Sequence, residues 1–529
     1  MENMASELES GVEKARLSVM HKSRITAQEA LSIEEKSPLF KPKIRQNPLS
    51  KKGQILLVAE LSAAAMLSLF IVPLLFLVLV VLKAGLSVLK FYVKRKYNCI
   101  PLKEDDAVWQ QETPTNRHII HAFMLMEGEP NVAELKSIVC ERLVFRVNDQ
   151  NERICPRMTQ AIKRYHGVYV WQEDCQFSID KHFCVWDGKL AKTKQELEEV
   201  ISEIASMSLP DNQSPWQFYV VPTKFESPSF VFLLRIHHSV GDGVSLTRVF
   251  VKNLYDKPPV GIEPKKFSTK HRLLMWCKAI LVGPMVVVKK FLTKPDFSLV
   301  HGQALSGKKV VSWSTDVNMA LVKHIKNMTG TTVNDVMVSC ISGAIHDYLK
   351  KHSITQPEDM WASVPVDIRS TRNSLTVENK FALVFLRLPV VAGSPLERLY
   401  AAKERMDVIK TSAEPLVTST TVTLLMMLPG WFSRVLINFF SNKMSCVLSN
   451  IPGPAELLSV GGQVVKEGIF WPPQRASIGL GLSIFSYGGG MRVGVFADKN
   501  IISYPAEVTE GFVKNFNELA NSLNCNKRD

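Results

Sequence analysis

The segment from Phe230 to Leu254 constrains the fold more than any other part of this 529-residue sequence. An apolar run, Phe230–Ile236, stops at the heptapeptide His-His-Ser-Val-Gly-Asp-Gly (residues 237–243), and a helix-like run, Val244–Leu254, follows. A short apolar run that ends at a glycine-containing turn indicates a buried strand, and apolar residues at helical spacing indicate a helix. The strand therefore delivers two imidazoles, a carboxylate and two glycines to its exposed end, where functional residues often lie.

The residue types in the heptapeptide suit proton transfer. A neutral imidazole can take a proton from a hydroxyl near neutral pH, and adjacent histidines in a tight bend point in different directions. Asp242 could orient an imidazole or pair with an arginine, while Gly241 and Gly243 permit positive φ and close backbone approach. With no serine or cysteine nucleophile in an elbow motif, the pattern favours direct attack of one substrate on another.

Two other interpretations of the heptapeptide stay open at this point. Histidines beside a strand end are often ordinary core or loop residues, and two histidines with a downstream aspartate could bind a metal ion. Adjacent residues rarely ligate one ion together, so no metal site is predicted.

Composition limits the class of protein. The length favours two or more domains, and 46% hydrophobic with 22% charged residues is typical of a globular chain. The net charge of +14 fits an anionic membrane face or a phosphorylated cofactor, or simply a surplus of solubilising lysines. No nucleic-acid partner is predicted, because no zinc-finger, recognition-helix or RNA-binding signature is present. Nine irregularly spaced cysteines indicate reduced thiols.

The N-terminal part consists of a polar segment and an apolar one. Residues 1–50 are rich in Lys, Glu and Ser and are expected to be flexible. Residues 51–96 contain the apolar run Ile55–Leu82, which exceeds the ~20 residues that a helix needs to cross a bilayer, so a membrane anchor is predicted. Basic residues on both flanks suit either a single span or a re-entrant hairpin that bends at Pro73. A buried soluble helix is the remaining alternative.

The rest of the chain is expected to form α/β layers in two domains. The N-terminal domain, 101–255, ends with the heptapeptide and its helix. Residues 256–300 form a connector, which is either an amphipathic membrane-surface segment or an ordinary packed helix. The C-terminal domain covers 301–529. Its predicted elements are a helix over Thr332–Leu349, a hairpin formed by Ile478–Tyr487 and Met491–Phe496, and a final helix after Pro505.

The heptapeptide resembles the HHxxxDG signature of the coenzyme A-dependent acyltransferase superfamily, which includes chloramphenicol acetyltransferase, carnitine acyltransferases and peptide-synthetase condensation domains. The wider sequence looks like one branch of it, the wax ester synthase/diacylglycerol acyltransferase family. Pro215-Trp216 resembles the Pro-Leu-Trp motif of that family without its leucine. The other matching motifs follow in the order of the family between about residues 101 and 525: Leu102–Trp109, Trp171 with Phe177 and His182, Thr332–Val336, Val364–Arg369, Asn379, Ser449–Pro454 and Ser486–Gly488.

This resemblance implies a fold and a set of roles. The fold would be two chloramphenicol-acetyltransferase-like domains with the active site in a tunnel between them. No metal or cofactor is implied, since acyl-CoA is a co-substrate. The site residues would be His238 as general base, His237, Asp242 and Gly243 as its supports, and Asn334, Asp335, Pro215 and Trp216 as tunnel or structural residues.

The sequence as a whole thus predicts a membrane-anchored O-acyltransferase. It would transfer a fatty acyl group from acyl-CoA to a long-chain alcohol, giving a wax ester, or to diacylglycerol, giving triacylglycerol. Use of acyl-CoA would place the catalytic domain on the cytosolic side of the endoplasmic reticulum, the plasma membrane or a lipid droplet. The alternatives are an acyltransferase for a sterol or an amine, and a non-catalytic lipid-binding protein, although the intact heptapeptide argues against the latter.

Overall fold

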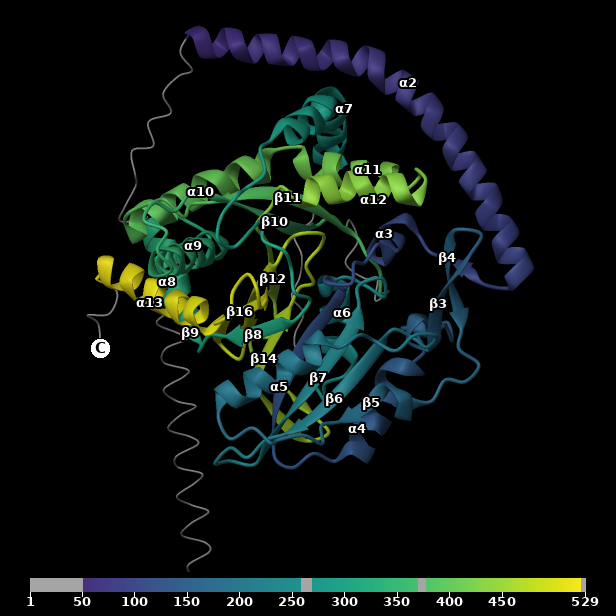
Figure 1. Ribbon diagram of the computed structural model, residues 1–529, viewed down its shortest axis with the longest axis vertical. Helices are drawn as coiled ribbons and strands as arrows, with labels where there is room; N and C mark the ends of the chain where they lie inside the picture. Colours follow the sequence, from purple (N-terminus) through teal and green to yellow (C-terminus); the bar gives the residue numbers. More distant parts are fainter. Residues whose placement is uncertain (1–50, 258–268, 370–376, 525–529) are drawn as a thin grey trace, which may run out of the picture.

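The structure is a computed structural model that describes residues 51–257, 269–369 and 377–524 (Figure 1). The segment 1–50, which the sequence predicts to be flexible, lies outside these residues, as do residues 258–268 of the predicted connector. Two large sheets and a small one carry the remaining elements, so the predicted mixed α/β fold is confirmed.

The first sheet has six strands in the order β13-β14-β2-β7-β6-β5. It includes β13 and β14, because β14 pairs antiparallel with β2. Strand β14 lies within 301–529, which the sequence assigns to the C-terminal domain, yet it belongs to the sheet of the N-terminal half. The predicted boundary therefore does not separate the two sheets, because a local pattern predicts a strand but not its partner. The strands are β2 (Ile119–Glu127), β5 (Phe183–Val185), β6 (Trp216–Pro222), β7 (Ser229–His237), β13 (Ser459–Val460) and β14 (Gln463–Trp471).

Helices cover both faces of this sheet. Apolar residues of α4 and α6, such as Leu135 and Leu246, share one core with Phe218 and Phe232 of the sheet, while α5 covers the opposite face. A small sheet in the order β1-β4-β3 lies beside them. The bounds are β1 (Ile100–Pro101), α3 (Glu104–Ala107), α4 (Val132–Val139) continued by a π-helix (Cys140–Val144), β3 (Gln160–Tyr165), β4 (Val168–Glu173), α5 (Lys194–Ser206) and α6 (Gly243–Asn253), with 3-10 turns at Val108–Gln110, Pro156–Thr159 and Ile179–His182.

The second sheet has the strand order β11-β10-β12-β15-β16-β8, and β9 pairs with β16. The predicted hairpin forms β15 and β16, and the predicted helices form α9 and α13, which pack on this sheet in one core. The strands are β8 (Lys309–Trp313), β9 (Val317–Asn318), β10 (Met360–Asp367), β11 (Phe381–Leu388), β12 (Cys446–Pro452), β15 (Leu480–Tyr487) and β16 (Gly490–Asp498), and the helices are α8 (Met319–Thr329), α9 (Val333–Lys351), α10 (Pro395–Thr411) and α13 (Ala506–Ser522).

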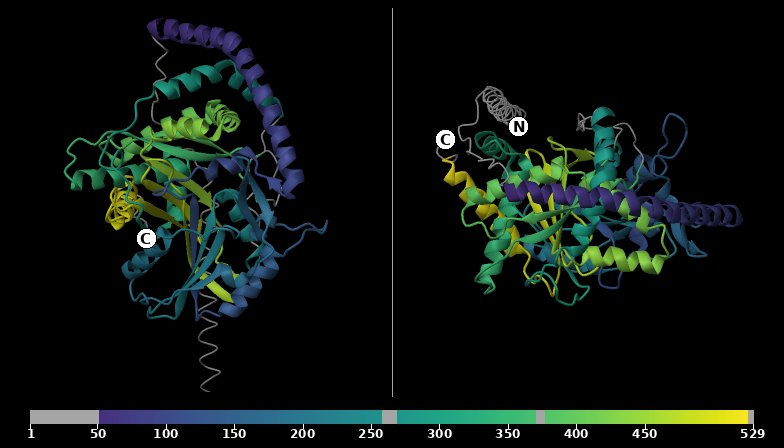
Figure 2. Two further views of the ribbon diagram at one scale, coloured as in Figure 1. Left: turned by 45° about the vertical axis from the view of Figure 1, so that its right-hand side comes forward. Right: turned by 90° about the horizontal axis from the view of Figure 1, so that it is seen from above.

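Four helices lie at one end of the molecule: α7 (Thr269–Leu292), α11 (Glu414–Leu425), α12 (Gly430–Ser441) and α2 (Lys51–Tyr97). Helix α2 arches over the other three (Figures 1 and 2). It continues without interruption through Pro73, so the predicted re-entrant hairpin does not form. Its C-terminal end packs on the small sheet, where Tyr97 stacks on Tyr165 with ring centroids 4.0 Å apart. Within the described residues, no helix combines the length and the hydropathy of a membrane span, and the predicted span is not confirmed.

Candidate active site

The heptapeptide forms the turn between β7 and α6. Asp242 is the N-cap of α6, because its Oδ1 accepts a hydrogen bond of 2.8 Å from the Ser245 amide. Neither Gly241 nor Gly243 has the positive φ that the sequence suggested. Their small size is needed for close approach instead: a Cβ would lie 2.4 Å from Val377 at Gly241, and 2.4 Å from Ile451 at Gly243.

The imidazole of His238 has one nitrogen fixed by a side-chain amide. Its Nδ1 lies 3.0 Å from Oδ1 of Asn379. The Asn379 Nδ2 donates to Oδ1 of Asp106 at 2.9 Å and to the His238 carbonyl oxygen at 2.8 Å. Because both of these partners can only accept, the amide presents its oxygen to the imidazole, and Nδ1 must carry the proton. The Nε2 of His238 is therefore the nitrogen with a free lone pair.

The carboxylate that orients Asn379 is itself held in place. Arg157 donates to both oxygens of Asp106, at 3.2 and 2.6 Å, and the same guanidinium donates to the carbonyl oxygens of Ser239 and Val240. A fork of this kind fixes the position as well as the charge of the carboxylate. Asp106 lies in the motif Leu102–Trp109, which carries the family resemblance, but no pattern in the sequence marks Arg157 as its partner.

An aromatic ring covers the face of His238. Trp109 stacks on the imidazole with a centroid separation of 3.7 Å and an interplanar angle of 19°. This burial lowers the pKa of His238 from its ordinary 6.5 to about 4. At neutral pH the imidazole is therefore uncharged and able to accept a proton.

His237 faces a different set of partners. Its Nδ1 accepts from the Ser239 amide at 3.1 Å, so that its Nε2 donates to Oε1 of Glu112 at 3.2 Å. Burial raises the pKa of Glu112, but the hydrogen bond from His237 opposes it, and the net pKa lies below the ordinary value. Both nitrogens of His237 are thus occupied, and this histidine braces the turn.

Asp242 pairs with an arginine, one of the two roles that the sequence left open. Its Oδ2 accepts from Arg369 at 2.6 Å and from the Lys380 amide at 2.8 Å. The Asp242 carboxylate thus connects the turn to the segment before β11 and holds the two sheets together at the site.

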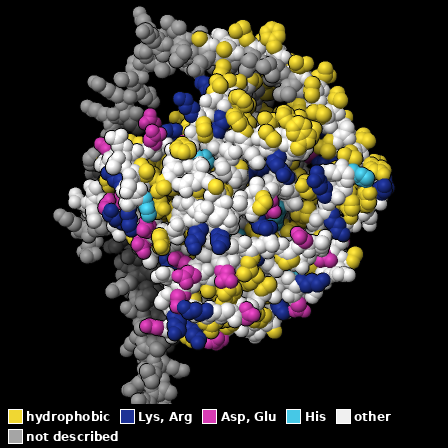
Figure 3. Space-filling view, in the orientation of Figure 1, with side chains coloured by type: hydrophobic (Ala, Val, Ile, Leu, Met, Phe, Trp, Pro, Cys, Tyr) yellow, Lys and Arg dark blue, Asp and Glu magenta, His cyan; other side chains and the backbone are white. Residues whose placement is uncertain are grey.

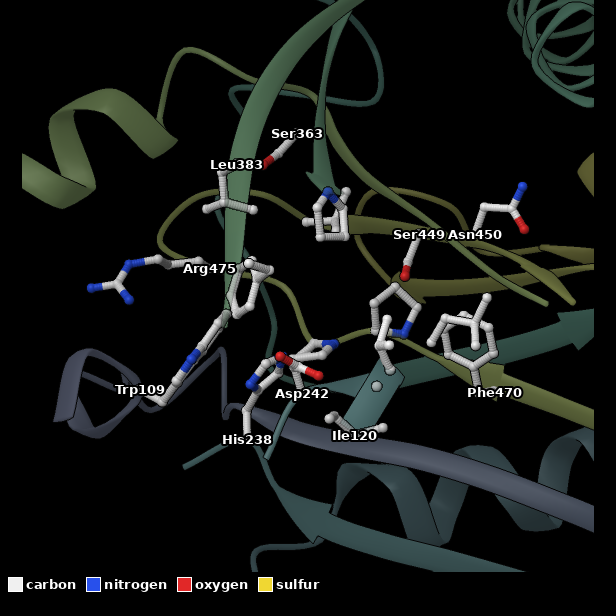
Figure 4. Close-up of a pocket in the computed structure, with 18 of the residues that line it drawn as sticks. Trp109, Ile120, His238, Asp242, Ser363, Leu383, Ser449, Asn450, Phe470 and Arg475 are labelled. Carbon is white, nitrogen blue, oxygen red and sulfur yellow. The ribbon is translucent and has the colours of Figure 1, made fainter. Parts of the chain in front are cut away.

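A cavity of about 110 Å³ lies against His238, between the ends of the two sheets (Figure 4). Its lining is mostly apolar and comes from both halves of the chain. In Figure 4, His238 and Asp242 lie on one side of the cavity, and Leu383 and Ser363 lie across from them. The volume is sufficient for a reacting ester group but not for two long alkyl chains.

The other residues expected at the site lie around this cavity rather than in it. Asn334 begins α9 and accepts from Asn450, which lines the cavity. Asp335 forms a capping box with Thr332 at the start of the same helix.

Pro215 and Trp216 support the strand that ends in the heptapeptide. The Pro215 carbonyl oxygen accepts from the His237 amide at 2.9 Å. Trp216 is fully buried, stacks on His182 at 4.2 Å, and donates from Nε1 to the Met158 carbonyl oxygen. Neither residue lines the cavity against His238.

Comparisons with known proteins identify a family and a shared fold. The profile of the wax ester synthase/diacylglycerol acyltransferase catalytic domain matches residues 102–294, and that of the WS/DGAT C-terminal domain matches residues 377–520. The O-acyltransferase WSD of Acinetobacter baylyi is 24% identical over 64% of this chain and 80% of its own length.

Two solved structures share the fold. The wax ester synthase/diacylglycerol acyltransferase from Marinobacter aquaeolei VT8 superposes with a TM-score of 0.57 at 17% identity, over 80% of this chain and 99% of its own. The first condensation domain of the CDA synthetase superposes with a TM-score of 0.52 at 14% identity, over 80% of this chain and 96% of its own.

Proposed function

Because the chain belongs to the wax ester synthase/diacylglycerol acyltransferase family and is an enzyme of that family, we propose that it transfers a fatty acyl group from acyl-CoA to a long-chain alcohol, to diacylglycerol, or to both. The observation that carries this proposal is the orientation of His238. Its Nδ1 is committed to Asn379, and its basic Nε2 is left for a substrate hydroxyl beside an apolar cavity.

The proposed reaction proceeds by direct attack. Nε2 of His238 removes the proton from the acceptor hydroxyl while the oxygen attacks the carbonyl carbon of the thioester. The tetrahedral intermediate collapses with cleavage of the C–S bond, and the imidazolium returns the proton to the leaving thiolate. The products are an ester and free CoA, and no covalent intermediate with the enzyme is required.

The environment of His238 supports this role. Burial keeps the imidazole neutral and excludes water, which would otherwise compete with the alcohol as nucleophile. The chain Arg157–Asp106–Asn379 holds the ring in one tautomer and one orientation before the substrate arrives.

The direct test is a thiol-release assay on the full-length protein with palmitoyl-CoA and hexadecanol, diacylglycerol or a sterol. We expect CoA release that depends on an acceptor and is abolished in His238→Ala, with the ester product identified by mass spectrometry. Release that is equal in wild type and His238→Ala would refute the proposed mechanism. Ester formed only with the sterol would refute the proposed acceptor class.

We also infer that the enzyme works at a lipid surface, because its acceptors partition into membranes. Large apolar side chains are exposed on α2, α7 and α12, the helices at one end of the molecule (Figure 3). Exposed apolar area of this extent is typical of an interaction site. This surface, the apolar arch, comprises Leu69, Phe70, Leu74 and Leu77 of α2, Leu274, Ile280 and Phe291 of α7, and Val435 of α12.

Liposome flotation tests this association. The double substitution Leu69→Glu/Leu74→Glu should release the protein from anionic vesicles, whereas Val185→Glu, at an exposed position of β5, should not. Equal flotation of both variants would contradict the assignment.

We propose the cytosolic face of the endoplasmic reticulum as the compartment. A C-terminal tag should then be sensitive to protease in sealed microsomes.

A further inference from the structure

A second cavity of about 720 Å³ lies between α2, the turn that joins α11 to α12, and the β3–β4 hairpin. Its walls are largely apolar and include Leu82, Leu86 and Leu89 of α2, and Met427 and Leu428 of the turn. The volume lies within the range of pockets that bind small-molecule ligands. Helix α2, which forms one wall, ends at Tyr97, before the family match begins at residue 102. The cavity is therefore formed in part by a segment outside the two family domains.

This cavity also has polar lining residues, among them Lys90, Glu104 and Arg434. Gln111 and Ser433 line it, and Nε2 of Gln111 donates to the Ser433 hydroxyl at 2.9 Å. Arg475, behind them, donates to Oε1 of Gln111 at 2.7 Å. Arg475 has no carboxylate partner within the described part of the chain, and burial lowers its pKa only to about 10, so it stays charged at neutral pH. The apolar walls fit a long alkyl chain, and the amide of Gln111 and the hydroxyl of Ser433 could bind a small uncharged polar head.

A single short segment separates this cavity from the one against His238. Ala107 and Gln111 line the second cavity, whereas Trp109, between them in the chain, lines the first cavity and stacks on His238. Arg475 also lines the first cavity. The partition therefore consists of the short segment 107–111 and the side chains on it, and Nε1 of Trp109 and Nε of Arg475 have no hydrogen-bond partner among the described residues. Side chains that are incompletely hydrogen-bonded can rearrange more readily than a strand of a sheet.

We propose that the second cavity, here called the acceptor vestibule, binds the alkyl chain of the hydroxylated acceptor and directs its hydroxyl past Gln111 and Trp109 towards His238. This inference rests on the proposed acyl transfer and assigns the place where one of the two substrates is held. Acyl-CoA is the alternative occupant, because Arg434 lines the vestibule without a carboxylate partner among the described residues and could bind a phosphate. The other two cations at the wall are engaged: Lys90 is bonded to Glu104 at 2.7 Å, and Arg164 lies over the ring of Tyr169.

Two glycines allow the vestibule to be filled from opposite walls. A Cβ added at Gly85 of α2 or at Gly430 of α12 would meet no atom within 4 Å, and both residues line the vestibule. Gly85→Phe and Gly430→Phe should each lower the ratio of kcat/KM for hexadecanol to kcat/KM for hexanol at least about tenfold, because a filled pocket excludes the long chain first. The matched control is Ala84→Phe, since Ala84 is exposed on the same helix and does not line the vestibule. Ratios that remain at the wild-type value in both glycine variants would overturn the proposal.

A labelling experiment separates this proposal from the proposed reaction. A photoreactive hexadecanol bound to full-length His238→Ala should label peptides that contain residues 81–90 or 426–434, in competition with hexadecanol. Labelling of these peptides by photoreactive palmitoyl-CoA, and not by the alcohol, would assign the cavity to the acyl donor and refute the proposal. Alcohol labelling in a protein that never releases CoA would support the vestibule while refuting acyl transfer. CoA release that depends on His238, with alcohol labelling only elsewhere, would refute the vestibule alone.

Discussion

His237 and His238 are neighbours in the chain and are both buried, yet their ring nitrogens lie in two different regions. The His238 ring is bonded at Nδ1 to Asn379 and faces a mostly apolar cavity, which leaves one ring nitrogen unbound. The His237 region is filled by Glu112 and the Ser239 amide, which occupy both ring nitrogens. The difference teaches that the availability of a lone pair, and not the presence of an imidazole, decides which histidine can act as a base.

Removal of each imidazole tests this contrast most strongly. His238→Ala should lower kcat about 100- to 10,000-fold, the usual contribution of a general base, while His237→Ala should leave most of the activity. Steady-state CoA release measures both, with circular dichroism to verify folding. Equal losses of kcat in the two variants would show that His237 contributes to the reaction as much as His238 does.

The amide that fixes the tautomer is the next target. Asn379→Ala removes the acceptor for Nδ1–H and lets the ring rotate, so kcat should fall about 100-fold, as expected for a misplaced catalytic group. The acceptor KM should change little. Gln110→Ala, which removes an amide beside His237, is the matched control and should have little effect on kcat. A loss confined to KM would show that Asn379 acts on binding and not on the imidazole.

The pH profile should report the burial of His238. The imidazole acts only when neutral, and its pKa is lowered to about 4, so kcat/KM should fall only as the pH drops towards 4 and not near 6.5. The same shift lowers stability in acid, since the unfolded chain binds a proton between about pH 6.5 and 4 that the folded one excludes. Each sample should therefore be returned to neutral pH and assayed again, because recovery of activity distinguishes reversible protonation from unfolding. A reversible inflection near 6.5 would mean that the active base is a more exposed histidine.

The smallest expected effect belongs to His237. In His237→Ala the half-buried carboxylate of Glu112 loses one donor but keeps the His118 amide at 2.6 Å, so the free energy of unfolding should fall by about 1 kcal/mol. Urea denaturation of His237→Ala and His237→Gln measures it, because glutamine can restore a donor. A gain in stability in both variants would contradict the bracing role.

Local sequence patterns predicted the elements that carry the site but not the contacts that complete it. The heptapeptide, β6, β7, α9 and the β15–β16 hairpin follow from apolar periodicity and turn residues, which depend on near neighbours. The convergence of Asp106, Arg157 and Asn379 on His238 depends on pairings between residues 51 to 273 positions apart, and no local period encodes those. The hairpin at Pro73, one of the two topologies that the sequence left open, does not form, because a single proline removes one hydrogen bond of a helix without determining the direction of the next turn.

The pairing of β14 with β2 has a consequence for how the protein is made. On a ribosome that adds about 5 to 20 residues per second, the roughly 340 residues between these strands take about 20 to 70 s to synthesise. Once β7 has been made, β2 has this neighbour but an open edge on the other side until β14 appears, and open edges recruit other chains. A truncated product that stops before Gln463 would retain the heptapeptide but expose this edge, so it should aggregate rather than accumulate as a smaller enzyme. The first sheet can therefore be completed only after Trp471 has been translated, close to the end of the chain.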